Sequence, residues 1–268
     1  MTEEKELPNQ LLKSARAGDQ AALESLLTEL QPQLYRFAML MCHHREDAED
    51  VTQDALLAVV RGLSSFRGDA KLSTWTFTIA RRFCGKRRRR DERSENLSPA
   101  ASLEQSSPWQ RETAQLEGPE ARAERGELWA QLEEGIRALP KEHREVLLLR
   151  DVEGLRAKEV AEVIGISVSA VKSRLHRARR TLRELIAPER PRDQGCPDIR
   201  QRFSEHLEGE LESQICVDLQ AHIDACPRCA RECDGLKQLL NLCGEVSCDP
   251  SPLFKKQLRA ALALILDP

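Results

Sequence analysis

Apolar residues recur along most of this chain at the three- and four-residue spacing of a single helix face. Leu23, Leu26, Leu27 and Leu30 follow this spacing, and Asp19 stands where an N-cap residue would begin the helix. Further stretches with helical spacing cover residues 47–63, 73–90, 127–139, 141–152, 157–164 and 169–186. Only 4% of the residues are aromatic, which suits helices better than a β-sandwich. The pattern therefore predicts an all-α protein.

Breaks in the pattern divide the chain into parts. The stretch after the third helix is rich in Ser, Pro, Gln and Glu and has no apolar period, which is typical of a flexible linker. Pro188 and Pro191 mark a second boundary. We therefore expect a helical domain at residues 1–93, a flexible linker at 94–125, a helix-turn-helix domain at 126–187 and a small helical domain at 188–268.

Charge is distributed unevenly although the total is close to neutral. The 41 Lys and Arg residues oppose 44 Asp and Glu residues, for a net charge of −3. Residues 71–93 alone contain nine basic and two acidic side chains, whereas residues 188–268 contain ten basic and 14 acidic ones. The total therefore hides a strongly basic segment and an acidic C-terminal part.

The cysteines are interpreted through the compartment that the sequence predicts. No stretch approaches the roughly 20 consecutive apolar residues of a membrane span, and the acidic start is unlike a secretion signal. We expect no membrane span and a cytoplasmic location, where thiols stay reduced. Cys42 and Cys84 stand alone and are interpreted as small buried side chains, whereas the other seven lie between Cys196 and Cys248. This crowding points to metal or redox chemistry.

Residues 158–180 have the form of a helix-turn-helix. Val160 and Ile164 face inward from a short helix, and Gly165 makes the turn into a second helix. The first residues of such a second helix reach base edges in the major groove, and its basic side chains contact phosphates. The candidate base contacts are Ser169, Lys172, Ser173 and His176, and the candidate phosphate contacts are Arg174, Arg177 and Arg180. A merely solvated basic face is the alternative, which the turn and the inward spacing disfavour.

A second basic run occupies residues 81–90, next to Trp75, Phe77 and Phe83. Aromatic rings can stack on unpaired bases while arginine and lysine contact the backbone, so this run is a candidate surface for melted DNA. Its candidate contacts are Arg81, Arg82 and Lys86. Trp75, at helical spacing from Ile79, is instead interpreted as a core residue.

Residues 139–185 and 45–88 resemble the fourth and second conserved regions of extracytoplasmic-function (ECF) sigma factors. The resemblance implies an initiation factor that binds core RNA polymerase and promoter DNA. It implies that an acidic helix face docks on the clamp helices of the polymerase β′ subunit, formed by Asp47, Glu49, Asp50, Gln53 and Asp54. It also implies that the loop of Phe66, Arg67, Gly68 and Asp69 takes the melted −10 element, and that Lys172, Ser173, Arg174 and Arg177 read the −35 element.

His222, Cys226 and Cys229 form an H-x3-C-x2-C pattern. On a helix that ends at the first cysteine, His222 and Cys226 share a face one turn apart, and the Cys-Pro-Arg-Cys turn presents the second thiolate. Cys196 is the predicted fourth ligand of a tetrahedral zinc site. Residues 196–232 resemble the zinc-binding domain of anti-sigma factors, a separate protein in relatives and here fused to a sigma factor.

Four further cysteines exceed what one structural zinc site needs, namely Cys216, Cys233, Cys243 and Cys248. With His206 as an additional ligand they are candidates for a second, sensing site, and such ligands favour zinc, cadmium or cuprous copper. The arrangement resembles the metal-dependent CorE-like sigma factors, in which a C-terminal Cys-rich domain replaces an external anti-sigma factor. The alternative is that these thiols are partly core and partly incidental.

The resulting hypothesis is a sigma factor without enzymatic activity, regulated by metal at its own C-terminal domain and needing no separate anti-sigma factor. One alternative is regulation by thiol redox state, with a purely structural zinc. Another is a helix-turn-helix regulator that does not act through core polymerase, against which the acidic helix face argues. A zinc hydrolase or deaminase needs an open coordination position, whereas the predicted ligand set is closed and the H-x-E…P-C-x-x-C pattern of deaminases is absent.

Overall fold

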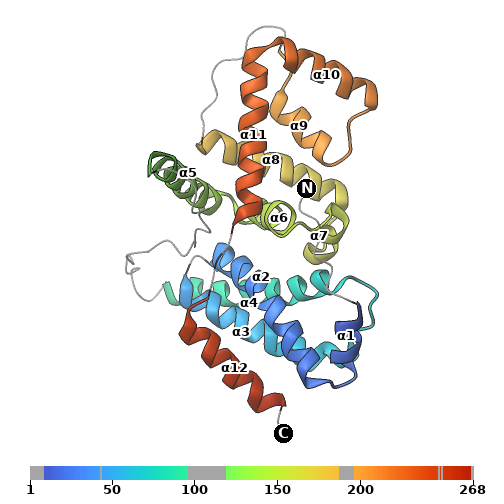
Figure 1. Ribbon diagram of the computed structural model, residues 1–268, viewed down its shortest axis with the longest axis vertical. Coiled ribbons are helices and arrows are strands. Elements are labelled where there is room, and N and C mark those ends of the chain that lie inside the picture. The colour runs from blue at the N-terminus through green and yellow to red at the C-terminus, as the bar shows by residue number, and fades with distance from the viewer. Residues whose placement is uncertain are drawn as a thin grey trace. The chain divides into compact units, whose positions relative to one another are not determined.

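The computed structural model describes residues 9–42, 44–95, 119–186, 196–246, 248 and 250–266. The regular elements of these ranges are helices, which confirms the predicted all-α class (Figure 1). The chain forms two compact units, one made of Met1–Glu112 with Ser247–Pro268 and the other of Thr113–Val246. The predicted C-terminal segment, residues 188–268, is therefore divided between the two units.

The first unit contains the long N-terminal helices and the last helix of the chain. Its elements are α1 (Asn9–Arg16), α2 (Gln20–Cys42), α3 (Arg45–Gly62), the short η1 (Leu63–Ser65), α4 (Leu72–Glu95) and α12 (Pro252–Leu266). Asp19 caps α2 as predicted, because its Oδ1 accepts a hydrogen bond from the Ala22 N–H at 3.1 Å. The rings of Phe37 and Phe77 meet edge to face at 5.5 Å in the core of this unit.

The second unit holds the helix-turn-helix and the Cys-rich segment. Its elements are α5 (Pro119–Ala138), α6 (Lys141–Leu147), the π-turn η2 (Leu148–Val152), α7 (Ala157–Ile164), α8 (Val168–Ile186), α9 (Ile199–Leu207), α10 (Ser213–Ala225) and α11 (Pro227–Glu245). Gly165 ends α7 with φ +79°, a left-handed conformation that glycine adopts without strain. The predicted turn between the two helices is thus confirmed.

The boundaries of the predicted linker differ from those of the helices around it. Most of residues 94–125 lies outside the described residues, but α4 continues to Glu95 and α5 begins at Pro119, before the predicted start at Glu127. Proline suits the first turn of a helix, since its missing N–H has no helical partner there. The Ala, Glu and Arg residues that follow Pro119 are good helix formers. The boundary predicted at Pro188 and Pro191 also lies outside the described residues.

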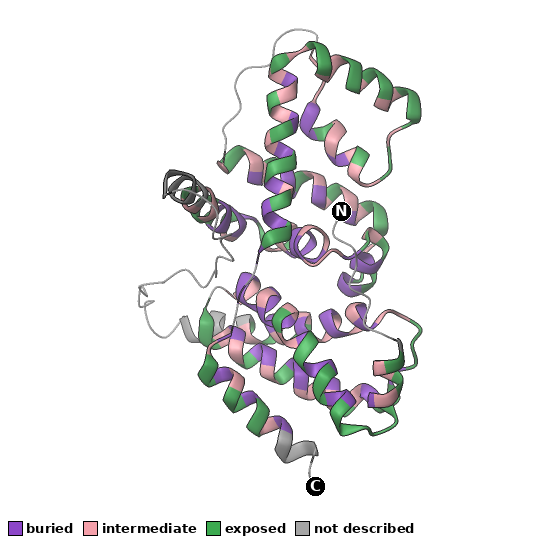
Figure 2. Ribbon diagram, viewed as in Figure 1, coloured by how far each residue is buried: buried purple, intermediate pink, exposed green. Residues whose placement is uncertain are grey.

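Burial shows how the Cys-rich segment joins the helix-turn-helix within the second unit (Figure 2). The helix α9 packs on α8 and the helix α11 packs on η2, and Val171, Leu175 and Leu182 are buried on the inner side of α8. A small apolar cluster of Ile199 and Leu236 with two cysteines holds α9 to α11. In contrast, α10 contributes no fully buried side chain, and its apolar packing on this cluster comes from the partly buried Leu219 and Ile223.

The helix α12 lies on α3 in the first unit. The ring of Phe254 packs on Tyr35 at 6.0 Å, and the Ser251 hydroxyl donates a hydrogen bond to Glu49 at 3.2 Å. Burial raises the pKa of Tyr35 to about 12. Among the described residues, no helix combines the length and the apolar character needed to cross a bilayer.

Candidate metal centre and nucleic-acid interface

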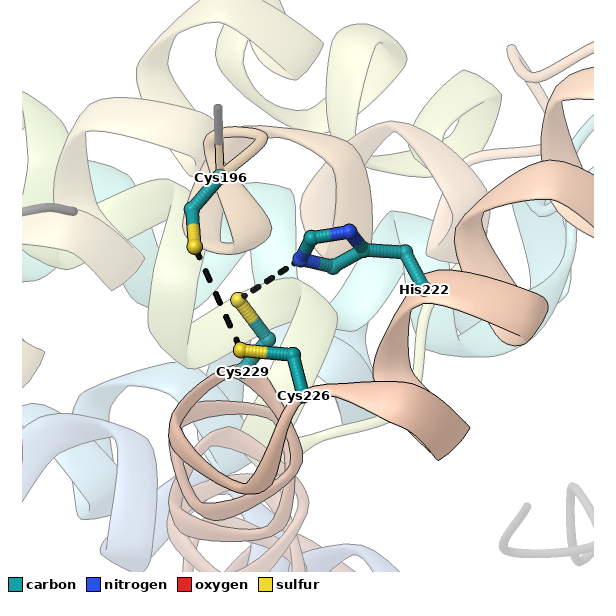
Figure 3. A group of neighbouring side chains, drawn as sticks. All are labelled: Cys196, His222, Cys226 and Cys229. Atoms are coloured by element: carbon teal, nitrogen blue, oxygen red, sulfur yellow. Dashed lines mark hydrogen bonds between the residues drawn. The ribbon is translucent and has the colours of Figure 1, made fainter. Parts of the chain in front are cut away.

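Four side chains from three places in the chain meet at one end of the second unit (Figure 3). Cys196 precedes α9, His222 lies in the last turn of α10, and Cys229 lies in the first turn of α11. Cys226 joins α10 to α11, and Pro227 follows it as the first residue of α11. The ligand atoms of all four residues lie within 4.8 Å of one another, so the structure brings the predicted zinc ligands together.

The geometry of the cluster fits a tetrahedral zinc site. The Sγ atoms of Cys196 and Cys226 are 4.0 Å apart, and His222 Nε2 is 3.3 Å from Cys229 Sγ. Ordinary Zn–S and Zn–N bond lengths give tetrahedron edges of about 3.5–3.8 Å, so small adjustments would seat the ion. Three sulfurs and one imidazole nitrogen complete four-coordination, which leaves no open position for a substrate or a reactive water.

The thiols of this cluster differ in their proton affinity. Burial raises the pKa of the Cys229 thiol to about 12, whereas a hydrogen bond from the Cys229 backbone lowers the pKa of the Cys226 thiol. A zinc ion would displace the proton of each coordinating thiol, because the thiolate is the ligand. A bound zinc ion would therefore neutralise the negative charge of the Cys229 thiolate, which burial otherwise disfavours.

The structure does not gather the four remaining C-terminal cysteines into one site. Cys233 lies in the apolar cluster between α9 and α11, and Cys243 is fully buried farther along α11. Cys248 belongs to the first unit. Cys216 is accessible on α10, and its Sγ lies 3.6 Å from His206 Nδ1. Within the described residues, the Cys196 cluster is the one group of three or more ligating side chains with such spacing.

The helix α8 exposes only part of its predicted DNA-binding face. Ser169, Ser173, Arg177 and Arg180 are exposed, whereas Lys172, Arg174 and His176 are half-buried. The Lys172 ammonium lies 3.1 Å from Glu210 Oε1 and donates to the Glu208 carbonyl at 3.1 Å. Arg174 lies 3.5 Å from a carboxylate oxygen of Glu142, and burial lowers the pKa of His176.

A buried ion network on α8 was not predicted from the sequence. Arg179 donates to both carboxylate oxygens of Asp151, at 2.8 and 2.6 Å, to Glu208 Oε1 at 2.9 Å and to Ser204 Oγ at 3.0 Å. Its side chain is 5% exposed. Burial lowers the pKa of Arg179, but the carboxylates of Asp151 and Glu208 raise it by more, so the pKa lies above its ordinary value. The available sequence signal was its spacing, four residues after the buried Leu175.

The predicted polymerase-docking face lies along α3. Asp47 and Asp50 both accept hydrogen bonds from Arg87 of α4, at 2.6 and 2.7 Å. Glu49 accepts from Arg45 as well as from Ser251. Gln53 is half-buried and Asp54 is exposed. The five predicted residues thus share one helix, and three of them have partners within the first unit.

The predicted −10 loop exposes three of its four residues. Arg67, Gly68 and Asp69 are exposed, and Gly68 has φ +83°, which favours glycine. Phe66 is buried against Trp75 at a ring distance of 5.0 Å. On the following helix, Arg82 and Lys86 are exposed and Arg81 is half-buried. Phe66 would have to leave its packing to contact a base.

Comparison with known proteins agrees with this architecture. The profile of Sigma-70 region 2 matches residues 26–94, that of Sigma-70 region 4 matches 129–182, and that of a zinc-finger family matches 196–230. These regions define a sigma-70-type initiation factor with an added Cys-rich zinc-finger region.

Curated relatives narrow the family. The ECF RNA polymerase sigma factor SigM of Mycobacterium tuberculosis is 34% identical over 177 residues, which cover 66% of this chain and 83% of the relative. The RNA polymerase sigma factor YlaC of Bacillus subtilis is 30% identical over 171 residues, covering 63% of this chain and 94% of the relative. The chain belongs to the family of ECF RNA polymerase sigma factors. These relatives are sigma factors, which are not enzymes, so they give no support to the hydrolase and deaminase interpretations.

A similar fold is found in the solved structure of another sigma factor. The sigma factor RpoE of Bartonella quintana, crystallised with the anti-sigma factor NepR, is 25% identical with a TM-score of 0.50, and the match covers 62% of this chain and 98% of that one. That relative has a separate anti-sigma factor, so the comparison gives no support to the expectation that this chain needs none.

Proposed function

We propose that this chain directs core RNA polymerase to promoters and that metal binding in its own Cys-rich segment controls this activity. One observation carries the regulatory part. Cys196 of the Cys3His cluster lies just before α9, and α9 packs on α8, the proposed recognition helix, within one compact unit. A change at the cluster therefore has a short physical route to the DNA-binding helix.

The proposed contacts follow the three surfaces described above. The acidic face of α3 would dock on the β′ clamp helices, and the loop after η1 with the basic face of α4 would hold the melted −10 element. The helix α8 would read the −35 element with Lys172, Ser173, Arg174 and Arg177, of which Lys172 and Arg174 are half-buried, while Arg180 adds a phosphate contact. Base contacts from Ser169 and His176 complete this surface.

A zinc ion would be held by Cys196, His222, Cys226 and Cys229. When bound, zinc supplies a structural cross-link rather than chemistry, because its coordination is complete. The cross-link would matter most for α10, which has no buried side chain of its own. Hydrogen bonds within the chain position α9 itself. Asp198 caps α9 by accepting from the Gln201 N–H at 3.1 Å, and Arg200 of α9 donates to Glu232 of α11 at 2.6 Å.

The sensed ion would bind at Cys216 and His206. This pair is accessible, and its sulfur and nitrogen donors suit zinc, cadmium or cuprous copper. Cys233 and Cys243 are poor candidates, because Cys233 lies in the apolar cluster between α9 and α11 and Cys243 is fully buried, so neither thiol is open to an ion that must bind and leave. The proposal therefore narrows the second site to one cysteine and one histidine.

The helix α12 would act on polymerase binding. It lies on α3, and Ser251, the residue directly before it, donates a hydrogen bond to Glu49, which is one of the proposed docking residues. Polymerase and α12 would then compete for the same helix in the first unit.

Redox control is the second candidate function. The Sγ atoms of Cys196 and Cys226 are 4.0 Å apart, within a small movement of the roughly 2.05 Å of a disulfide. A two-electron oxidant such as a peroxide would accept the electrons of the two thiolates as they form the disulfide, which would release zinc and switch the segment without a sensed metal.

In vitro transcription with purified core polymerase distinguishes these functions. The zinc-loaded chain is assayed with added zinc, cadmium or cuprous ions and, separately, with an oxidant. Metal-dependent transcription that is lost in Cys216→Ser but kept in Cys42→Ser supports the proposal, since Cys42 is also partly accessible but lies in the first unit. A response to oxidant alone would favour redox control, and the absence of specific transcription would refute the sigma role.

A further inference from the structure

The loop between α9 and α10, residues 208–212, carries three carboxylates, and two of these residues contact the recognition helix. We call this segment the acidic loop. It follows α9 directly and precedes α10 at Ser213. Gly209 within it has φ +67°, so the chain turns sharply there.

Glu208 is the buried anchor of the acidic loop. Its side chain is 3% exposed and accepts hydrogen bonds from Arg179 at 2.9 Å and from Arg150 at 3.4 Å. Two arginines therefore surround one carboxylate, the arrangement by which proteins hold a phosphate group. This contact fixes the position of the loop on the helix.

Glu210 and the loop backbone bind the ammonium of Lys172, which is one of the proposed DNA contacts. The Lys172 ammonium is engaged by Glu210 Oε1 and by the Glu208 carbonyl, each at 3.1 Å. An ammonium has three donors, so these two contacts leave it little capacity for a DNA phosphate or base. The nearby carboxylates would also repel a phosphate that approached.

We propose that the acidic loop imitates DNA phosphates on α8 and keeps Lys172 from promoter DNA until the loop is released. The inference rests on the proposed function only in taking α8 as the −35-reading helix. Loop and DNA are mutually exclusive occupants of this part of α8. Arg177 and Arg180 remain exposed beside it and give the initial attraction for DNA.

The Cys3His cluster and the acidic loop stand at opposite ends of α9. Cys196 precedes the first residue of the helix, and Glu208 follows the last. Arg179 also donates to Ser204 in the middle of α9, so the helix is held to α8 along its length. Fixing the start of α9 at the metal cluster thus stabilises the docked loop, and freeing the start favours release.

The test measures DNA binding of the full, zinc-loaded chain, with duplex DNA selected from a random pool by the Glu208→Gln/Glu210→Gln double variant. We expect Glu210→Gln to tighten binding about threefold, as befits one partly exposed ion pair, and the double variant to tighten it further. The double variant should also show a steeper salt dependence, by about one unit, because Lys172 gains a phosphate. Glu212→Gln is the matched control, since Glu212 is exposed and makes no hydrogen bond to the start of α10.

Lys172→Ala completes the test in both backgrounds. It should weaken binding strongly in the double variant and only slightly in the wild-type loop, where Lys172 is already engaged. Equal losses in the two backgrounds, or unchanged affinity in Glu210→Gln and in the double variant, would overturn the proposal while leaving α8 as the DNA-binding helix. Glu210→Gln alone guards against misfolding, because its side chain is 41% exposed. If no variant bound any selected duplex, the DNA role of α8 would fail as well.

Discussion

Arg179 shows how one side chain can serve folding inside a helix whose outer face we propose to bind DNA. It is buried with the carboxylates of Asp151 and Glu208, so removing the guanidinium takes the partner from one buried carboxylate and leaves the other with Arg150 alone. Breaking a buried ion network in this way costs about 3–5 kcal/mol. We predict that Arg179→Met lowers the free energy of unfolding by that amount, measured by urea unfolding with hydrogen exchange of α8 peptides.

Arg180→Met is the matched control for this prediction. Arg180 is 50% exposed and pairs with Glu184 at 3.7 Å, so its loss should change stability by no more than about 0.5 kcal/mol. Similar exchange rates for the two variants would show that the buried network does not stabilise the unit.

Asp54 offers the cleanest test of polymerase docking. Asp47 and Asp50 are engaged by Arg87, so reversing their charge would also disturb α4, whereas Asp54 is exposed. We predict that Asp54→Lys weakens binding to core polymerase about tenfold or more, since a positive charge would replace a negative one on the proposed docking face. The melting temperature should change little, because Asp54 is exposed. Pull-down and calorimetry measure the two effects. The control is Glu24→Lys on the exposed side of α2, and equal binding by both variants would argue against α3 as the docking helix.

At the scale of elements, local patterns were sufficient where one helix or turn decides the outcome. The turn at Gly165 and the cap at Asp19 follow from short sequence signals and are present as predicted. The start of α5 at Pro119 was missed, because the weak apolar period there hid residues with good helix propensity. The position of α12 was missed as well, since one apolar helix face does not say which surface will cover it.

The contact of α12 with α3 leads to a prediction for this element. A chain that ends at Pro250 lacks α12 and should bind core polymerase more tightly, about tenfold if docking of the helix is worth about 1.4 kcal/mol. Phe254→Ala should act in the same direction, because its ring packs on Tyr35. Leu253→Ala is the control, since Leu253 is 65% exposed. If truncation left polymerase affinity unchanged, α12 would not compete with polymerase.

At the scale of the whole molecule, zinc should stabilise the second unit and leave the first unaffected. Zinc at about 1,000 times its dissociation constant adds about 4 kcal/mol to the folded state. We predict that chelation lowers the unfolding temperature of the second unit, with faster hydrogen exchange in α9, α10 and α11. Cys229→Ser should lose the bound zinc, whereas Cys233→Ala should keep it, because Cys233 lies in the apolar cluster. The zinc content of the two purified variants is measured by metal analysis. Equal zinc content in Cys229→Ser and Cys233→Ala would refute the ligand assignment.

The long-range contacts of the molecule mark the limit of prediction from sequence. The pattern around His222 predicted three ligands because they are close in the chain, and Cys196 followed from its place before a helix. Nothing local connects Arg179 to Glu208 or Lys172 to Glu210, since these pairs form only when α9 packs on α8. The candidate −35 contacts all lie on one helix, α8, whereas the acidic loop that engages Lys172 comes from a different part of the chain, after α9.

The length of α9 has a consequence of its own. Each residue advances an α-helix by about 1.5 Å and turns it by about 100°. One alanine inserted into Ile199–Leu207 would therefore rotate Glu208 by about 100° around the helix axis relative to Cys196, away from Arg179. Substitutions on the outer face of α9 leave this phase intact. The number of residues in α9 thus sets the orientation of Glu208 relative to Cys196. The length of this helix should therefore vary less than its composition among proteins that share this arrangement.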